Sequence, residues 1–370
     1  MKIPNPILQA TCVSALFLLA TTFAANAQQP STPQAPPAHD MEHMHHHGGF
    51  MGAGMHHAVA KGIKLEQQLD AASHTVTLRE GPFTLPANTD HMKMPQPTDL
   101  FWSIPIDGWL LAYTPRLVDA AGKSVPGRVL HHVAFWNTSR SDFLCPNKEE
   151  HIFGAGSELT NWIEIPGYGY RVQKGDKIRV ETMVYNPTPI SYNQVYLEVK
   201  MPYADSANAN ENPLVKSVYP AWMDVMSCRD SGYDLKAGEN INTGSVAVKY
   251  DGILLGVGGH MHDYAKQIVL EDVTRKDTVV TLDAKLDQNG ELLSMPVVTF
   301  FDKGGYKFSA GDQLKITATY DNPTGKPLPD GAMGIVVGYF VPNNDAPMSA
   351  LRRKPKSSGS RQVAAITHDH

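Results

Sequence analysis

Cysteine, excess charge and helical periodicity are all scarce in this sequence. It has 3 cysteines in 370 residues, and its formal net charge is -5. A charge balance this close to neutral gives no reason to expect nucleic acid as a partner. No stretch keeps the 3.6-residue apolar period over the length of a long amphipathic helix, which argues against a helical fold. The chain is long enough for two domains.

Long hydrophobic runs are absent after the first residues. Residues 1–27 combine a basic start at Lys2, the apolar stretch ILQATCVSALFLLATTF and a small-residue cleavage site, Ala25-Asn26-Ala27. This is the pattern of a secretory signal peptide, with an uncleaved membrane anchor as the alternative. No other run approaches the ~20 apolar residues that span a bilayer. We therefore expect a secreted or periplasmic protein without membrane contact once the signal is cleaved.

Export also decides how the cysteines are interpreted. Cys12 leaves with the signal peptide, whereas Cys145 and Cys228 remain in an oxidising compartment. They either form a disulfide that ties the two halves of the chain together or stay as two buried thiols.

Residues 28–72 are expected to form a disordered leader, since their first part is rich in Pro, Gln, Gly and Ser and has no apolar period. This part carries four methionines and seven histidines, of which six lie close together in two groups: His43, His45, His46, His47, His56 and His57. Imidazole and thioether are ligands that suit copper, and thioether favours Cu(I). The leader therefore predicts copper scavenging or delivery. A flexible linker with incidental metal affinity is the alternative.

The rest of the chain consists of short apolar or alternating segments separated by turn residues. Segments such as KIRVETMVYN and QLKITATYD are rich in Val, Ile, Thr and Tyr, and Gly, Pro, Asn or Asp follow them. Many short strands at close spacing are typical of antiparallel sandwiches and jelly rolls.

An internal match indicates two sandwiches of the same kind. GYRVQKGDKIRVETMVYNPT, residues 169–188, aligns without a gap to GYKFSAGDQLKITATYDNPT, residues 305–324, and 7 of the 20 positions are identical. Two hairpins that share only their turn chemistry are the alternative. We predict an all-β fold of two tandem antiparallel jelly-roll β-sandwich domains, at 73–203 and 217–343, with a linker at 204–216 and a flexible tail at 344–370.

Three features of these strands have the residue types of a metal site. His131 and His132 lie in the apolar strand VLHHVAFW, where imidazoles cost burial energy unless they are paired or coordinated. Because adjacent strand residues point to opposite faces, both bind one metal only if the strand is distorted or ends there. His260 and His262 lie two residues apart in GGHMHDY, which places their rings on one face, and Met333 opens the strand MGIVVGYFV. A core histidine beside a surface one, a chance pair and a packing methionine are the alternatives.

Together, the HH pair, the HxH pair and the late Met resemble the copper type II, ascorbate-dependent monooxygenases, which include the peptidylglycine and dopamine β-hydroxylating enzymes. The similarity in order and spacing covers residues 75–343, and GGHMHDY and DGAMGIVVGYF also look like segments of the stress-upregulated nodulin-like proteins. The resemblance implies two eight-stranded jelly rolls. It implies that His260, His262 and Met333 hold the copper that activates O₂, and that His131 and His132 hold a second copper that supplies an electron.

The sequence departs from this family at three positions. Met183 stands where the family has the third histidine of the second site, and His151 and His91 are possible substitutes that no spacing favours. Gly258 stands where the peptide-amidating members have an Arg that grips a carboxylate, and Val337 stands where they have a Tyr. The resemblance therefore does not extend to the recognition of peptide C-termini.

Three functions are compatible with these residues. The leading prediction is an exported copper-dependent monooxygenase with one or two copper ions per chain. It would hydroxylate a C–H bond of a small-molecule or short-chain substrate, using O₂ and a reductant such as ascorbate. The alternative is a non-catalytic periplasmic protein that binds and buffers copper. The third is a tandem β-sandwich that binds carbohydrate or protein and whose histidines are incidental.

Overall fold

The computed structural model describes residues 58–89, 93–157, 161–206 and 215–353. All of them belong to one compact unit, residues 42–370. The predicted signal peptide, the histidines of the leader and His91 lie outside the described residues, as does most of the predicted linker. Within the described ranges, no helix is long and apolar enough to cross a membrane.

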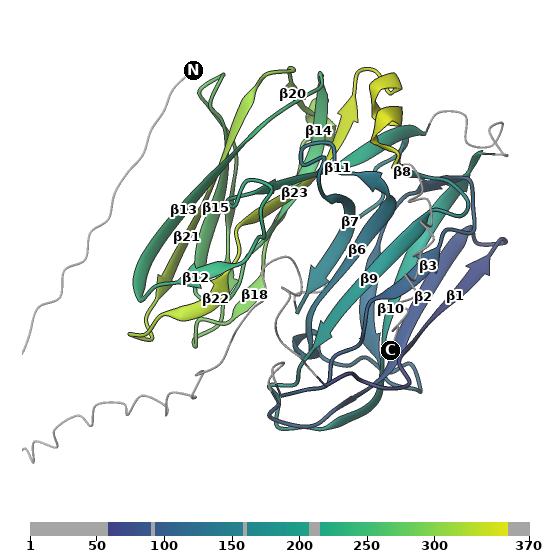
Figure 1. Ribbon diagram of the computed structural model, residues 1–370, viewed down its shortest axis with the longest axis vertical. Coiled ribbons are helices and arrows are strands. Elements are labelled where there is room, and N and C mark those ends of the chain that lie inside the picture. Colours follow the sequence, from purple (N-terminus) through teal and green to yellow (C-terminus); the bar gives the residue numbers. More distant parts are fainter. Residues whose placement is uncertain (1–57, 90–92, 158–160, 207–214, 354–370) are drawn as a thin grey trace, which may run out of the picture. The chain divides into compact units, whose positions relative to one another are not determined.

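The described chain is almost entirely β-structure (Figure 1). The strands of its first half are β1 (Lys64–Asp70), β2 (Thr75–Leu85), β3 (Leu100–Ser103), β4 (Gly108–Leu110), β5 (Thr114–Val118), β6 (Leu130–Ser141), β7 (Glu149–Gly156), β8 (Tyr168–Val172), β9 (Lys177–Val184) and β10 (Tyr192–Asp205).

The strands of the second half are β11 (Lys216–Asp224), β12 (Tyr233–Leu235), β13 (Gly238–Ala247), β14 (Gly252–His260), β15 (Ala265–Asp272), β16 (Asp277–Asp283), β17 (Lys285–Leu286), β18 (Leu292–Ser294), β19 (Val297–Thr299), β20 (Tyr306–Phe308), β21 (Gln313–Asn322), β22 (Leu328–Ala332) and β23 (Ile335–Pro342). Short 3-10 helices are η1 (Gly127–Val129), η3 (Phe301–Lys303) and η4 (Ala346–Leu351). The predicted all-β fold of antiparallel, jelly-roll-like sandwiches is confirmed.

The first half packs two sheets around one core. A four-stranded sheet has the order β3-β9-β6-β7, and the opposite layer runs β1-β2-β10-β4-β8, with β5 also on β10. Alternate residues of these strands point inward, so Phe135 and Val180 from one layer meet Leu78 and Leu197 from the other.

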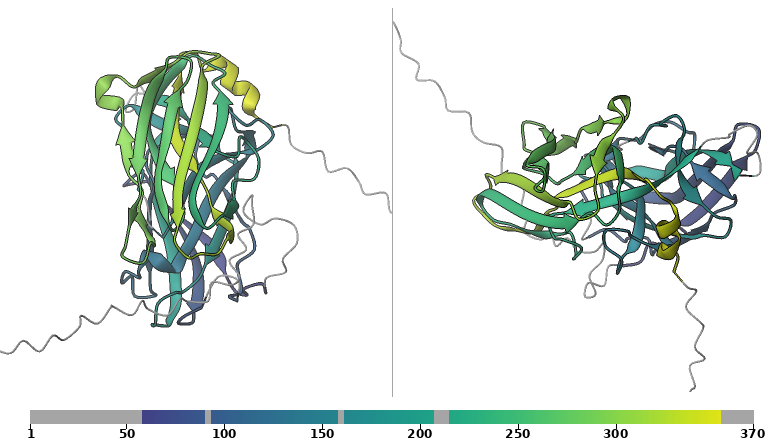
Figure 2. Two further views of the ribbon diagram at one scale, coloured as in Figure 1. Left: turned by 90° about the vertical axis from the view of Figure 1, so that its left-hand side faces the viewer. Right: turned by 90° about the horizontal axis from the view of Figure 1, so that it is seen from above.

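The second half repeats this arrangement with its own core. Its four-stranded sheet has the order β13-β21-β15-β16 (Figure 2), and its other layer runs β11-β23-β14-β19. Ile268 and Ile316 from the first of these layers pack with Leu254 and Phe340 from the second.

Strand pairing and apolar packing both join the halves. Strands β8 and β11 pair in parallel, with Ser217 opposite Gly169, so one sheet continues through both halves. A smaller cluster joins Trp136 on β6 to Trp222 on β11 and Ile335 on β23. Because β6 packs on both of its faces, its apolar run is nearly continuous rather than alternating.

The two segments that match in sequence adopt the same local structure. The side-chain amide of Asn186 donates to the carbonyl of Ile190 at 2.8 Å, and its oxygen accepts from the N–H of Thr188 at 3.1 Å. Asn322 repeats this with the carbonyl of Lys326 at 2.7 Å and with the N–H two residues ahead, also at 3.1 Å. Each Asn thus closes the turn that follows its strand. The boundaries of the two predicted domains stay predictions.

Two segments that the sequence assigned to the leader and the tail are ordered. Lys64–Asp70, within the predicted disordered leader 28–72, is the edge strand β1, paired with β2 along its whole length. Its polar sequence KLEQQLD does not predict a strand, because an edge strand is mostly exposed and needs few apolar residues. In the predicted tail, Met348 and Leu351 of η4 are buried, and Arg352 pairs with Asp176 at 2.9 Å.

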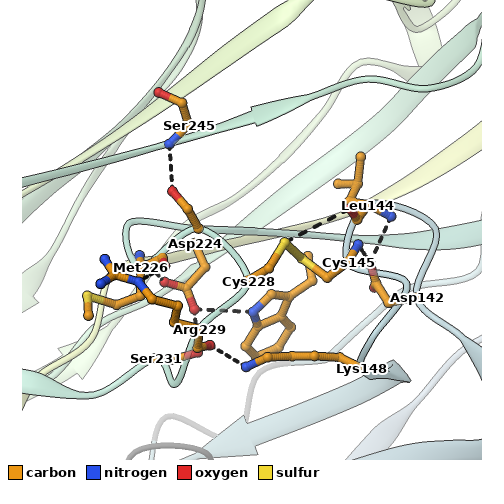
Figure 3. The surroundings of a disulfide bond; sticks show 12 residues. Asp142, Leu144, Cys145, Lys148, Asp224, Met226, Cys228, Arg229, Ser231 and Ser245 are labelled. Atoms are coloured by element: carbon orange, nitrogen blue, oxygen red, sulfur yellow. Dashed lines mark hydrogen bonds between the residues drawn. A yellow bond between two sulfur atoms is a disulfide. The ribbon is translucent and has the colours of Figure 1, made fainter.

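Cys145 and Cys228 form a disulfide, with their Cα atoms 5.4 Å apart (Figure 3). The Asp142 carboxylate holds the loop before β7 by accepting the backbone N–H groups of Leu144 at 2.8 Å and Cys145 at 2.6 Å. On the other side, Lys148 donates to the carbonyl of Arg229. The bond therefore ties the β6–β7 loop to the turn after β11, and the alternative of two free thiols does not hold.

Candidate metal centre

His131 occupies a bulge at the start of β6. Leu130 lies opposite Val184 and His132 lies opposite Met183, so one extra residue stands on β6 between two consecutive partners on β9. A bulge of this kind rotates the chain locally and lets two successive side chains approach each other. The Nδ1 atoms of His131 and His132 are 3.0 Å apart. The strand is therefore distorted in the way that a shared ligand role requires.

This spacing fits a single ion. Two nitrogens 3.0 Å apart that each bind an ion at ~2.0 Å subtend an angle of roughly 97° there, since 1.5/2.0 is the sine of half that angle. Such an angle is acceptable for both Cu(I) and Cu(II), and imidazole is a good ligand for either. The Nδ1 atoms of the HH pair therefore have a spacing that is compatible with one copper ion.

The HxH pair lies at the end of β14, beside the HH pair. His260 is the last residue of the strand, and its ring centre is 5.4 Å from that of His262. The ring of His262 is in turn 6.2 Å from that of His131. The rings of His132, His131, His262 and His260 are thus successive neighbours, here called the histidine row, although His132 and His260 are far apart in the sequence.

Tyr320 connects the HxH pair to Met333. Its buried hydroxyl accepts the backbone N–H of His262 at 2.9 Å and that of Met333 at 3.2 Å, and it donates to the Met333 carbonyl. Met333 lies in the short connection between β22 and β23, rather than opening the strand as predicted. One phenol on β21 therefore fixes two of the three predicted ligands of the O₂-activating site.

Both candidate methionine ligands are buried. Met333 is 3% exposed and packs with Trp136 and Trp222. Met183 is 5% exposed and lies directly across from His132, and residues that face each other on neighbouring strands point to the same side. The thioether of Met183 is thus placed on the face that carries the HH pair.

The fit to a metal is partial. In the part of the chain that the structure describes, no three His, Cys, Asp or Glu side chains are grouped so that they could hold one metal ion. Imidazoles and thioethers are a donor set that suits copper better than Mg²⁺ or Ca²⁺, which require oxygen ligands.

A cavity of about 60 Å³ lies beside the histidine row. His132 and His260 line it, together with His151 on β7 and the two tryptophans Trp162 and Trp222. The cavity therefore receives side chains from both halves of the chain, and it gives a bound molecule a place next to the imidazoles.

His151 is a neutral imidazole in the wall of this cavity. Its ring is edge-on to those of Trp136 at 4.6 Å and Trp222 at 4.1 Å. Burial, with smaller effects of His260 and Arg179, lowers the pKa of His151 to about 3. Its Nδ1 is buried and has no hydrogen-bond partner among the described residues, so the ring keeps unused capacity for a hydrogen bond.

The histidine pairs can be recognised in the sequence, but most of the residues that surround them cannot. His151 was considered only as a replacement ligand, and no spacing placed it beside His132. Trp162, Trp222 and Tyr320 were not singled out, because an aromatic residue among apolar neighbours is usually core. Only Tyr320 carried a usable signal, since it replaces Val184 in the otherwise similar repeat.

The chain matches no family model. It is 24% identical over 240 residues to M1 of Phoma sp., a probable copper-dependent oxygenase, and the match covers 58% of this chain. It is 25% identical over 237 residues to the probable copper-dependent oxygenase clz3 of Cochliobolus lunatus, again over 58% of this chain. This chain is similar to copper-dependent oxygenases. The match spans 58% of the length of M1 and 72% of that of clz3.

The chain aligns only weakly with solved structures. The glycosylasparaginase PNGase F from Flavobacterium meningosepticum aligns with a TM-score of 0.35 and 8% identity, over 73% of this chain and 96% of its own. A structure from Sulfolobus Turreted Icosahedral Virus aligns with a TM-score of 0.33 and 9% identity, over 78% and 93%. Likeness at this level carries no argument about function.

Proposed function

We propose that this protein is an exported copper-dependent monooxygenase, which hydroxylates a C–H bond of its substrate with O₂ and a reductant such as ascorbate. The observation that carries the proposal is the single row formed by two histidine pairs from different halves of the chain, with ring centres 6.2 Å apart between His131 and His262. The similarity to two probable copper-dependent oxygenases supports it.

In this proposal the two halves hold separate coppers. His260, His262 and Met333 would hold the copper that meets O₂, and His131, His132 and Met183 would hold the second. Bound copper supplies one-electron chemistry, since this ligand mixture supports both Cu(I) and Cu(II). One or two ions per chain are compatible with these donors.

The surrounding residues position the ligands and keep water out. Tyr320 holds the backbone of His262 and Met333, so neither ligand has to be ordered when a metal binds. Trp136 and Trp222 cover Met333 and line the side of the site away from solvent. A dry pocket protects a reactive oxidant from side reactions with water.

Copper content and O₂ consumption test the proposal together. The mature chain and a variant without residues 28–57 are loaded with copper, dialysed and supplied with ascorbate. We expect the shortened chain to keep at least one copper and to consume O₂. We expect His260→Ala/His262→Ala to stop consuming O₂ and to bind less copper, because only the site at His131 and His132 is left. The matched control is His74→Ala, a histidine that packs against Tyr203 away from the row.

The same measurements separate the alternatives. Copper that leaves with residues 28–57, without O₂ consumption by the remainder, would favour the copper-buffering protein. Equal copper binding by the parent and by His260→Ala/His262→Ala would make the histidine pair incidental and would rule out the proposed site.

A further inference from the structure

The cavity beside the histidine row is lined by apolar side chains, backbone and imidazoles. Trp162, Trp222 and Val337 supply apolar surface, Gly154 and Gly258 expose only backbone, and the imidazoles are those of His132, His151 and His260. Among the described residues that line the cavity there is no Asp, Glu, Lys or Arg. In the copper-free chain, a charged ligand would therefore lose its hydration without gaining a counter-charge from a carboxylate, ammonium or guanidinium group of the wall.

The charge of Arg179, which acts on His151 in the cavity wall, does not change this. Arg179 already pairs with Glu181 at 2.8 Å, Glu149 at 3.1 Å and Asp99 at 3.3 Å. Its positive charge is thus neutralised within its own cluster. Burying an ion without a dedicated partner costs several kcal/mol in a protein interior.

Small residues and rigid aromatic rings shape the cavity. A β-carbon at Gly154 would come within 3.2 Å of Cε1 and Nε2 of His151, which is tighter than ordinary contact, so glycine leaves room for that ring. Trp162 is held through its backbone, which exchanges hydrogen bonds of 3.0 and 3.1 Å with Tyr113. The walls are thus preformed, which lowers the entropic cost of binding.

The volume limits the size of what enters. A cavity of about 150 Å³ is known to hold a benzene molecule, so a cavity of about 60 Å³ is too small to enclose a whole ring. It has room for a short alkyl group or for the edge of a ring.

We propose that the cavity binds an uncharged, apolar part of the substrate, a short alkyl group or the edge of a ring. The term substrate rests on the proposed function, because the cavity adjoins the row that would hold copper. The protein would then select against small carboxylates and small ammonium compounds alike, which distinguishes it from an enzyme that anchors its substrate by charge.

Three probes of one shape test the charge selection. Benzamide, benzoate and benzylammonium share a phenyl ring and differ in the charge attached to it. Dissociation constants are measured by ligand-observed NMR on the full mature chain, with and without copper. We expect benzamide to bind to the copper-free chain at least 10-fold more tightly than either ion.

Two variants locate the binding. A β-carbon at Gly258 would meet Trp162 at 3.4 Å and Val297 at 3.5 Å, which is ordinary contact, so Gly258→Leu can fill the cavity without disturbing β14. Val337→Phe fills it from the opposite strand, since Val337 lies across from Gly258. Each should weaken benzamide binding at least 10-fold, whereas Ile241→Leu on the exposed face of β13 should leave it unchanged.

The proposal is overturned if either ion binds as tightly as benzamide, if none of the probes binds, or if both filled variants bind like the parent. Copper content is measured on the same preparations. A chain that keeps the preference for benzamide but binds no copper would refute the proposed function and leave the selectivity of the cavity standing. A copper-loaded, O₂-consuming chain without that preference would refute only the present inference.

Discussion

The hydroxyl of Tyr320 should stabilise the fold and the metal site together. Tyr320→Phe keeps the ring, which is completely buried on β21, and removes only the oxygen. That oxygen takes part in three hydrogen bonds, two from backbone N–H groups and one to a carbonyl, all in the segments that carry His262 and Met333. At ~1 kcal/mol net for each bond, the substitution should lower the free energy of unfolding by about 3 kcal/mol.

Tyr320→Phe should also weaken copper binding. Without the phenol, the HxH turn and the Met333 connection are no longer fixed to the same atom, and changes of this kind around metal ligands cost ~10–100-fold in affinity. We expect a value near the lower end, about 10-fold, because Tyr320 contacts the backbone of the ligands and not their donor atoms. Denaturant unfolding of the copper-free chain measures the first effect, and competition with a copper chelator measures the second.

Tyr339→Phe is the matched control. Its hydroxyl is also buried, but it has no hydrogen-bond partner among the described residues. Removing it should therefore be neutral or slightly stabilising, although the chemical change is identical. Equal effects of Tyr320→Phe and Tyr339→Phe on unfolding would show that the three bonds of Tyr320 contribute nothing, and the account of how the ligands are held would be wrong.

The remaining predictions concern the scaffold. Replacing Cys145 and Cys228 by Ser opens a loop closed over a separation of 83 residues, which should cost about 4 kcal/mol in denaturant unfolding; an unchanged midpoint would contradict this. Burial raises the pKa of Asp142 to about 7. The stabilisation from its protonated carboxyl group is therefore complete below pH ~4 and is lost as the pH rises through about 7. Asp142→Asn should therefore stabilise the fold by up to about 4 kcal/mol at pH 8 and hardly at pH 4, and a pH-independent difference between the two chains would refute the assignment. Asn186→Ala and Asn322→Ala should each cost about 2–3 kcal/mol, because both side chains make the same turn-closing bonds; a large loss in only one of them would show that the repeated turns are not equivalent in energy.

Local sequence pattern was sufficient to predict the fold class. Alternation and turn residues predict antiparallel strands wherever one face is buried, and the HH pair could be tied to a strand distortion because neighbouring side chains on a regular strand diverge. The bulge between Leu130 and His132 agrees with that condition. The edge strand Lys64–Asp70 was not predicted, because an exposed strand does not need the alternating apolar residues by which strands are recognised.

The relation between the pairs could not be predicted. The distance from His131 to His262 depends on how β6 meets the β11-β23-β14 layer, and this is set by the parallel pairing of β8 with β11 and by the contact of Trp136 with Trp222. Neither interaction has a signal in local sequence, since both join segments far apart in the chain. The cavity was unforeseen for the same reason, and the pairing of Cys145 with Cys228 could not be decided without knowing that their loops meet.

The repeated turn also reveals an asymmetry between the two halves. When the matching segments are superposed by their Asn residues, Tyr320 falls on Val184, which has no polar atom on its side chain. The second half thus clamps its histidine pair through a phenol for which the first half has no counterpart at this position. A metal held by His131 and His132 should consequently exchange with solution faster than one held by His260 and His262, so that chelation would empty the two halves one after the other.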